Sequence, residues 1–171
     1  GAPGHHFQIS LAQENEALPA FMRFGGNTAY VEGWALYSET LGYEMGFFDD
    51  PWNRYGTLQD EQLRAMRLVV DTGLHAKGWS REQAIDFMLA NSGMTRTEVV
   101  AEVERYIAIP TQALAYKVGA LKIQELREKA EEQLGDKFDI REFHAEVLDT
   151  GSLPMPVLEA KIDRWIASKA S

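Results

Sequence analysis

Helix-start signals recur along the whole chain, and they constrain its fold more than any other feature. Asp50 precedes Pro51, which pairs a capping side chain with a proline at the first position of a helix. Ser80 is followed three residues later by Gln83 in the pattern of a capping box, and a second such pattern begins at Thr95. Between these signals apolar residues recur three and four positions apart, and no convincing stretch alternates as a strand would. The sequence therefore predicts an all-α fold.

The predicted helices follow one another with only short connections. Asn27 is expected to cap a helix that Gly46 ends, and Asp139 is expected to cap one near the end of the chain. No repeat, low-complexity segment or linker separates them, so residues 1–171 are predicted to form a single domain. The helices are expected up to residue 15 and over 28–46, 52–77, 81–93, 96–109, 111–135, 140–151 and 154–170.

The composition and charge of the chain narrow the classes of partner that it can bind. Its 171 residues are enough to bury a sizeable core. A net charge of −9 with scattered basic residues argues against nucleic-acid binding. No apolar run approaches the roughly eighteen residues of a membrane helix, so no membrane span is expected. Because the chain has no cysteine, any metal must be held by histidine, aspartate or glutamate. We expect a soluble protein, with its compartment open between the cytoplasm and export.

Two adjacent histidines, His5 and His6, follow a Pro-Gly pair directly before the first predicted helix. One interpretation is an ordinary exposed helix start. The other is the second half of a metal-binding motif whose first half lies upstream of the chain. Adjacent helical side chains point about 100° apart, so only one of the two is expected to bind a metal. His144 lies among apolar residues and is predicted to pack between helices instead.

Two glutamates lie on one face of the predicted helix over 28–46. Glu32 and Glu39 are seven residues apart, a spacing that places them on the same side of a helix. Trp34 and Tyr37 fall on other faces, among apolar neighbours. Such an acidic pair is compatible with a solvated stripe, and it is also compatible with a metal site.

Three polar residues spaced four apart follow in the long helix over 52–77. Arg67, Asp71 and His75 share one helix face. One interpretation is a ladder of ion pairs on a solvated face. The other is an orienting network in which His75 stabilises an oxyanion or holds substrate.

The helix over 111–135 carries a further group of candidates. Tyr116 is a candidate donor to an oxyanion, with a core tyrosine of satisfied hydroxyl as the alternative. Lys117 is a candidate for holding a substrate carboxylate, or it extends along the surface to solvent. Gly119 costs helix stability by roughly 1 kcal/mol relative to alanine, which predicts close packing at that position. Arg105 and Tyr106, just before this helix, are weaker candidates.

The stretch from Glu32 to Glu39, EGWALYSE, resembles the glutamate helix of zinc aminopeptidases of the gluzincin group. In that helix the first glutamate binds zinc as the third protein ligand. The resemblance therefore implies that Glu32 is a zinc ligand. It also implies that Glu39 orients a ligand or the helix that carries it.

The chain as a whole resembles the C-terminal part of bacterial DUF885 proteins. The resemblance rests on five motifs in order: GAPGHHFQ, YVEGWALYSE, RLVVDTGLHAKGWS, IPTQALAYKVG and FHAEVLDTGSLP. It implies a zincin-like helical fold and a chain that is the C-terminal portion of a larger protein. In the family a His-Glu precedes the Pro-Gly-His-His, which implies that a missing histidine binds zinc and a missing glutamate is the general base.

The resemblance predicts a zinc-dependent peptidase in the parent protein. A catalytic zinc ion takes three protein ligands, keeps one position for water and lowers the pKa of that water toward neutrality. With the His-Glu missing, this chain alone is expected to bind zinc weakly or not at all and to be inactive. The expected partner is a peptide substrate, although a metal hydrolase of another substrate class stays open. The alternative is a non-catalytic helical module that associates with itself or with the missing N-terminal half.

Overall fold

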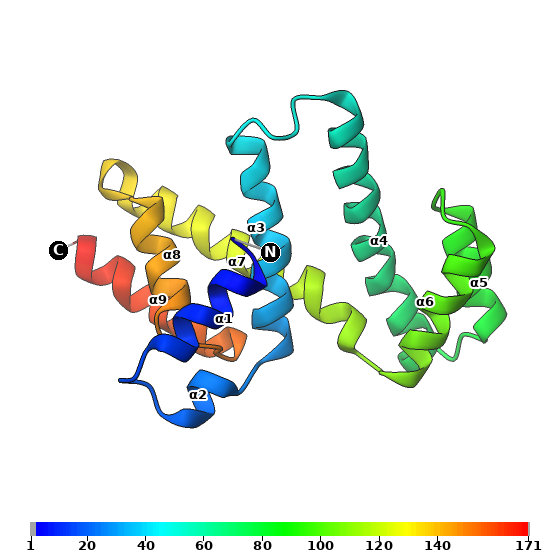
Figure 1. Ribbon diagram of the computed structural model, residues 1–171, viewed down its shortest axis with the longest axis horizontal. Coiled ribbons are helices and arrows are strands. Elements are labelled where there is room, and N and C mark those ends of the chain that lie inside the picture. The colour runs from blue at the N-terminus through cyan, green and yellow to red at the C-terminus, as the bar shows by residue number, and fades with distance from the viewer. Residues whose placement is uncertain (1–2, 171) are drawn as a thin grey trace. The chain divides into compact units, whose positions relative to one another are not determined.

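The computed structural model describes residues 3–170, and helices dominate that part of the chain (Figure 1). Residues 3–170 contain nine α-helices, one 3-10 turn (Gly135–Lys137) and no strand, which confirms the predicted all-α class. None of the described helices is both long enough and apolar enough to cross a membrane. The helices are α1 (His5–Glu14), α2 (Ala20–Phe24), α3 (Thr28–Glu44), α4 (Pro51–Ala76), α5 (Arg81–Ala90), α6 (Arg96–Ala108), α7 (Gln112–Leu134), α8 (Ile140–Leu148) and α9 (Met155–Ala170).

The predicted caps form as hydrogen bonds. The Asp50 carboxylate accepts from the backbone amide of Trp52 at 2.9 Å at the start of α4. Both predicted capping boxes, at the starts of α5 and α6, are complete. Asn27 accepts from the Tyr30 amide at 3.2 Å. The short helix α2 was not predicted, because five residues after Pro19 are too few to show a helical period.

The chain divides into two compact units. The first unit contains the residues up to 39 and those from 118 onward, and the second contains residues 40–117. The prediction that the chain forms a single domain stays a prediction.

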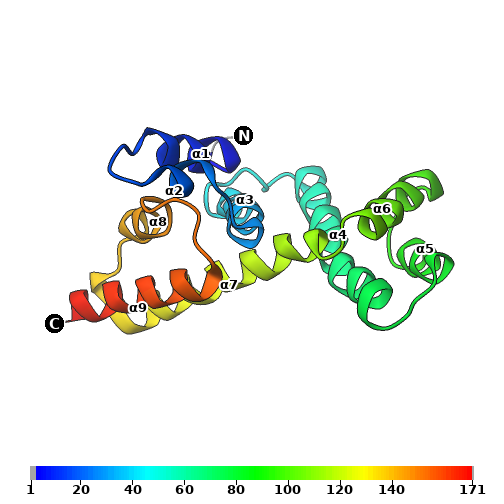
Figure 2. The same cartoon turned by 90° about the horizontal axis from the view of Figure 1, so that it is seen from below.

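The first unit has a core of aromatic and aliphatic side chains. Tyr30, Trp34 and Tyr37 of α3 are each about 1% exposed, because their spacing of four and three residues keeps them on one helix face. Figures 1 and 2 show α9 beside the later part of α7, where Lys129 Nζ donates to Asp163 Oδ1 at 2.6 Å. The other buried side chains of this core include Ile123, Leu126, Phe143, Val147, Leu158 and Ile162.

The first unit also contains a very close approach of two helices at glycines, as the sequence predicts for Gly119. A Cβ atom on Gly33 of α3 would lie 2.5 Å from the backbone of Gly119 in α7. A Cβ atom on Gly119 would lie 1.8 Å from the carbonyl oxygen of Ala29. Only glycine fits at either position. The contact fixes how α3 lies against α7, and with it the position of Glu32, the neighbour of Gly33.

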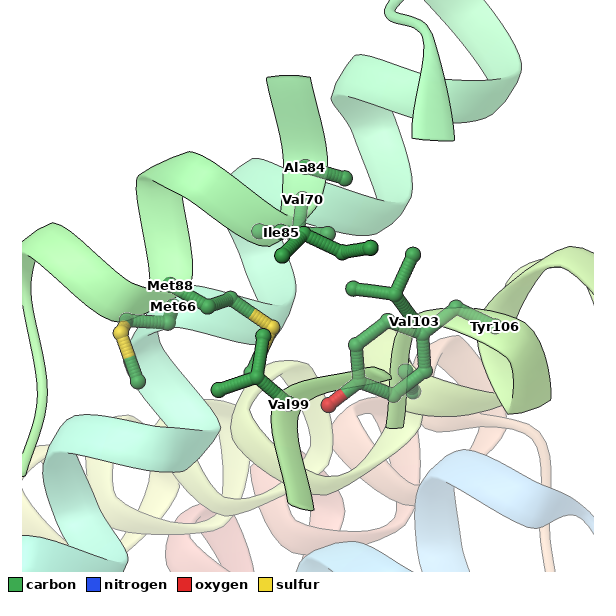
Figure 3. Close-up of a cluster of buried hydrophobic side chains, with 9 residues drawn as sticks. Met66, Val70, Ala84, Ile85, Met88, Val99, Val103 and Tyr106 are labelled. Carbon is green, nitrogen blue, oxygen red and sulfur yellow. The ribbon is translucent and has the colours of Figure 1, made fainter. Parts of the chain in front are cut away.

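The second unit packs α4, α5 and α6 around one buried cluster, which Figure 3 shows with its side chains turned toward one another. The capping boxes fix the residues at which α5 and α6 begin. The apolar residues of both helices then pack against the second half of α4. The first half of α4 lacks this cover, and Trp52 there is 80% exposed. The cluster comprises Met66, Val70, Ala84, Ile85, Met88, Val99, Val103, Tyr106 and Ala113.

Candidate metal site and a buried charged network

A histidine and a glutamate meet where α1 begins. His5 is the first residue of α1, and Glu32 lies in the second turn of α3. The His5 Nε2 atom lies 3.1 Å from the Glu32 Oε2 atom. The glutamate side chain is 16% exposed and the histidine ring 43% exposed, so the pair sits at the edge of the first unit. The structure thus brings together two of the three residues predicted as metal ligands.

Two hydrogen bonds join the N-terminal segment to α3 near this pair, and a third joins α3 to α8. Trp34 Nε1 donates to the carbonyl oxygen of Pro3 at 2.9 Å, which anchors the residues just before His5. Gln8 Nε2 donates to the carbonyl oxygen of Tyr30 at 3.4 Å. The Tyr30 hydroxyl donates to the carbonyl oxygen of Val147 at 2.6 Å. Burial raises the pKa of that hydroxyl, so it keeps its proton and remains a donor. The tryptophan of the EGW motif therefore serves to position the histidine segment.

The other predicted residues of this unit are exposed. His6 and Glu39 both lie on the surface. Among residues 3–170 no three histidine, aspartate or glutamate side chains gather closely enough to hold a metal ion. His144 packs as predicted: its ring meets Trp34 edge-on at 5.3 Å, and its Nε2 lies 2.8 Å from the Tyr37 hydroxyl.

The second unit contains a buried charged network centred on Arg67. Its Nη2 donates to Glu102 Oε2 at 2.9 Å, and its Nε donates to the Tyr106 hydroxyl at 3.1 Å. The Tyr106 hydroxyl in turn donates to Glu102 Oε2 at 2.5 Å. Arg105 adds a donor to the same oxygen at 3.1 Å. Arg67 is 7% exposed, so this arginine is a charged residue inside the unit and is paired there.

The electrostatics of this network favour the charged carboxylate. Burial by itself would raise the pKa of Glu102, but hydrogen bonds from Arg105, Tyr106 and Arg67 lower it to about 2. Burial and the bond to Glu102 raise the pKa of Tyr106 to about 12. The tyrosine therefore keeps its proton and the glutamate its negative charge over the whole physiological range.

The interpretation of Arg67, Asp71 and His75 as ion pairs on a solvated face is wrong. Asp71 is 1% exposed, and both of its carboxylate oxygens accept from the amide of Thr111, at 3.2 and 3.1 Å. Thr111 has a φ of 70°, an unfavourable value for a β-branched residue, so Asp71 holds a strained turn at the start of α7. His75 is exposed, and its Nε2 lies 3.0 Å from the carbonyl oxygen of Tyr106.

The two candidates of α7 in this unit also have partners. The Tyr116 hydroxyl accepts from Gln112 Nε2 at 3.3 Å, and the Arg67 guanidinium lies over its ring at 4.9 Å. Lys117 Nζ forms an ion pair with Glu61, and its predicted role in holding a substrate carboxylate stays a prediction. Gln112 also accepts from Arg105 at 2.8 Å, so Tyr116 belongs to the same network as Arg67.

Two residues of these groups were not predicted. Glu102 lies three residues before Arg105 and four before Tyr106, a spacing that could have marked it as their partner. Gln8 lies one turn after His5 and is 4% exposed, although glutamine on a short helix gives no sign of burial in the sequence.

The chain is similar to part of two longer solved proteins. It is 52% identical to a candidate lipoprotein from Colwellia psychrerythraea over 99% of this chain and 29% of that one, with a TM-score of 0.96. It is 29% identical to a candidate lipoprotein of unknown function from Shewanella oneidensis over 94% of this chain and 29% of that one, with a TM-score of 0.83. The chain therefore spans about 29% of the length of either solved protein.

The search of curated proteins gives no match. Residues 1–162 match the family described as "Bacterial protein of unknown function (DUF885)", in agreement with the resemblance of the five sequence motifs. The chain belongs to the DUF885 family.

Proposed function

We propose that this chain supplies two protein ligands, His5 and Glu32, to the zinc site of a peptidase. The observation that carries the proposal is the 3.1 Å distance between His5 Nε2 and Glu32 Oε2. The two residues are 27 positions apart in sequence and reach each other only through the docking of α1 on α3. His6 and Glu39, the neighbouring candidates, are exposed.

The donor set fits two of the three ligands of a catalytic zinc ion. Imidazole nitrogen and carboxylate oxygen each bind zinc at about 2.0–2.2 Å, so two such ligands in a tetrahedron lie roughly 3.4 Å apart. The observed separation is close to that value without any metal present. The third ligand and the general base lie outside the described residues, and the family resemblance assigns both to a His-Glu that precedes Pro-Gly-His-His.

The chemistry would be hydrolysis of a peptide bond. A zinc ion held there would polarise a carbonyl group and lower the pKa of water. Other residues of this chain orient the two ligands. Trp34 anchors the start of α1, and the contact of Gly33 with Gly119 sets the position of Glu32.

The predicted candidates of the second unit form a group of their own. In this proposal Tyr116 keeps its predicted role as a hydroxyl donor to an oxyanion, and the Arg67 guanidinium over its ring supports that role. Asp71 holds the turn that precedes Tyr116, and Arg67 lies over the ring of Tyr116. Both residues therefore help to position this hydroxyl. His75 and Lys117 are candidates for substrate contact, and Lys117 would first have to leave Glu61.

Zinc binding tests the proposal directly. Calorimetry is performed on this chain and on a version extended upstream through the His-Glu, each with and without Glu32→Ala. We expect tight binding of one zinc ion by the extended form, weak binding by the short form, and weaker binding in both after Glu32→Ala. Cleavage of a mixture of unstructured peptides by the extended form, lost after Glu32→Ala, tests the reaction. Equal zinc binding with and without Glu32 would refute the site.

A second candidate function, a helical interaction module, is favoured by the uncovered apolar face of α4. Trp52, Tyr55 and Leu58 lie on the first half of that helix and are at least half exposed. A groove of about 580 Å³ continues from this face to Met66 and Met94. Because the solved relatives are more than three times as long, we propose the rest of the family protein as the occupant of this face.

The descriptions of the solved relatives support a proposal for the compartment. Both solved proteins are described as candidate lipoproteins, a class that is exported and held at a membrane surface by lipid. We extend this to the protein that contains this chain, so its peptide substrates would be those available outside the cytoplasm. Fractionation of cells that express the full gene would test the assignment, and a cytoplasmic location would exclude it.

A further inference from the structure

Two buried polar atoms beside the candidate metal ligands lack a hydrogen-bond partner among the described residues. They are Nδ1 of His5 and Oε1 of Gln8. Gln8 is 4% exposed, so water does not bathe its amide. Leaving a buried polar group unpaired costs free energy, and such atoms in a native structure call for a specific explanation.

The two atoms belong to side chains that lie on the same face of one helix. His5 and Gln8 are three residues apart in α1. Side chains of an α-helix lean toward its N-terminus, so the Gln8 side chain leans back over the turn that holds His5. Both side chains also reach α3, His5 at Glu32 and Gln8 at the carbonyl of Tyr30.

The bond to Tyr30 determines which end of the Gln8 amide is available. A carbonyl oxygen can only accept, so the amide nitrogen of Gln8 must face Tyr30. The amide oxygen, which can only accept, is therefore the unpaired end. A partner for this oxygen must be a hydrogen-bond donor. His5 Nδ1 becomes a donor in one of the two neutral tautomers of the imidazole.

That tautomer is also the one that a metal ligand requires. A histidine that binds metal through Nε2 carries its proton on Nδ1, and this N–H almost always donates to a carboxylate, a carbonyl oxygen or water. The Nε2 atom lies 3.1 Å from the Glu32 carboxylate oxygen Oε2, on the side of the ring where the metal would bind. Gln8 offers the acceptor that the metal-binding tautomer needs.

We propose that Gln8 is a positioning residue for His5: its Oε1 accepts a hydrogen bond from the Nδ1–H of His5 and directs the Nε2 lone pair toward a divalent metal ion. The inference rests on the proposed metal site of His5 and Glu32. It pairs the two orphaned atoms with each other. The bond from Gln8 to Tyr30 is long, 3.4 Å, so the amide can turn toward the ring at small cost.

The test uses zinc titrations of this chain extended upstream through the His-Glu and of three variants of that form, followed by NMR of ¹⁵N-labelled histidine. Gln8→Leu removes the acceptor, and Gln8→Glu retains an oxygen in the same place. Gln13→Leu makes the same chemical change at an exposed position of the same helix. Loss of such a supporting partner lowers metal affinity by about 10- to 100-fold, so we expect at least a tenfold loss in Gln8→Leu only.

A role in packing alone would not affect the histidine proton. In the zinc-bound wild-type chain and in Gln8→Glu we expect an Nδ1–H signal of His5 that exchanges slowly with water. In Gln8→Leu that signal should be lost to exchange, while the circular dichroism spectrum stays unchanged. Zinc affinity equal to wild type in Gln8→Leu, with affinity lost in Glu32→Ala, would overturn this inference and leave the metal pair standing. No zinc binding by the wild-type chain extended upstream through the His-Glu would overturn both.

Discussion

The two units of the molecule each hold a group of polar side chains, and the groups differ in how completely their atoms are paired. In the second unit Arg67, Glu102 and Tyr106 satisfy one another through three hydrogen bonds of 2.5 to 3.1 Å. In the first unit His5 meets Glu32 through one ring nitrogen, and its other ring nitrogen is buried with no hydrogen-bond partner among residues 3–170.

The difference separates a group that completes a fold from a group arranged to bind something else. A buried charged network that is fully paired stabilises one arrangement of helices and has little capacity left for a ligand. A buried donor or acceptor without a partner costs free energy. A hydrogen bond from a ligand or from a further segment of protein removes that cost. The comparison therefore favours the first unit as the place where a metal binds.

The largest expected effect comes from the glycine contact that sets the position of Glu32. In Gly119→Ala the new Cβ would lie 1.8 Å from a backbone oxygen, and two helix backbones cannot separate without disturbing the core. We expect a loss of about 3 kcal/mol or more in the free energy of unfolding, measured by urea denaturation. Zinc affinity should fall with it.

The matched control is Gly56→Ala in α4. Apart from its chain neighbours and its own helix backbone, no described atom lies within 4 Å of the position of its Cβ, and the residue is in a helix. Alanine there should raise stability by up to about 1 kcal/mol. Equal effects at Gly56 and Gly119 would show that the close approach of α3 and α7 does not occur.

The next largest effect is expected for Arg67→Met. Removal of the guanidinium leaves Glu102 partly buried with fewer donors, and breaking such a pair from one side costs about 3 kcal/mol. Arg81→Met is the control, because Arg81 makes its ion pairs with Glu82 and Glu104 at the surface and should change stability little. Similar urea midpoints for the two variants would contradict the description of the Arg67 network as an internal part of the unit.

The sequence predicts the helices of both units well, because caps and apolar periods are local. Both capping boxes and the Asp50 cap are present, and the long helices end within a few residues of their predicted limits. Gly119 was correctly assigned to close packing, since an interior glycine weakens a helix unless something occupies the space of its side chain.

The partners of the site residues were much less predictable. Arg67 and Glu102 are 35 residues apart, and nothing local to either indicates that α4 and α6 bring them together. The spacing of Arg67, Asp71 and His75 suggested mutual contact, but each is bound elsewhere, because α6 and the turn before α7 offer other partners. The docking of α1 likewise decides that His5, of the two adjacent histidines, meets Glu32.

A smaller effect is expected from the pH dependence of Glu102. Its pKa is about 2 in the folded chain against an ordinary value of 4.5, so the unfolded chain binds this proton more readily. The stabilisation is therefore complete above about pH 4.5 and is lost as the pH falls toward 2. Because Glu102 is 23% exposed, solvent screening reduces the contribution, and we expect about 1–2 kcal/mol.

Glu102→Gln removes this titration. Urea denaturation at pH 6 and pH 3 should show a smaller stability difference in the variant than in the wild-type chain. Glu104→Gln, on the exposed side of the same helix, should keep the wild-type difference. If Glu102→Gln retained the full difference, other carboxylates would be responsible and the network would not hold Glu102 charged.

The smallest effect on stability is expected for Trp52→Ser on the uncovered face of α4. Trp52 is 80% exposed, so its loss should change the free energy of unfolding by less than about 0.5 kcal/mol. If this face normally binds another part of the family protein, the isolated chain should associate with itself at high concentration, and Trp52→Ser should reduce that association. Sedimentation velocity over a range of concentrations measures it. Phe21→Ser, which removes a 76% exposed aromatic from the first unit, is the control, and an equal reduction there would mean that general surface apolarity is responsible.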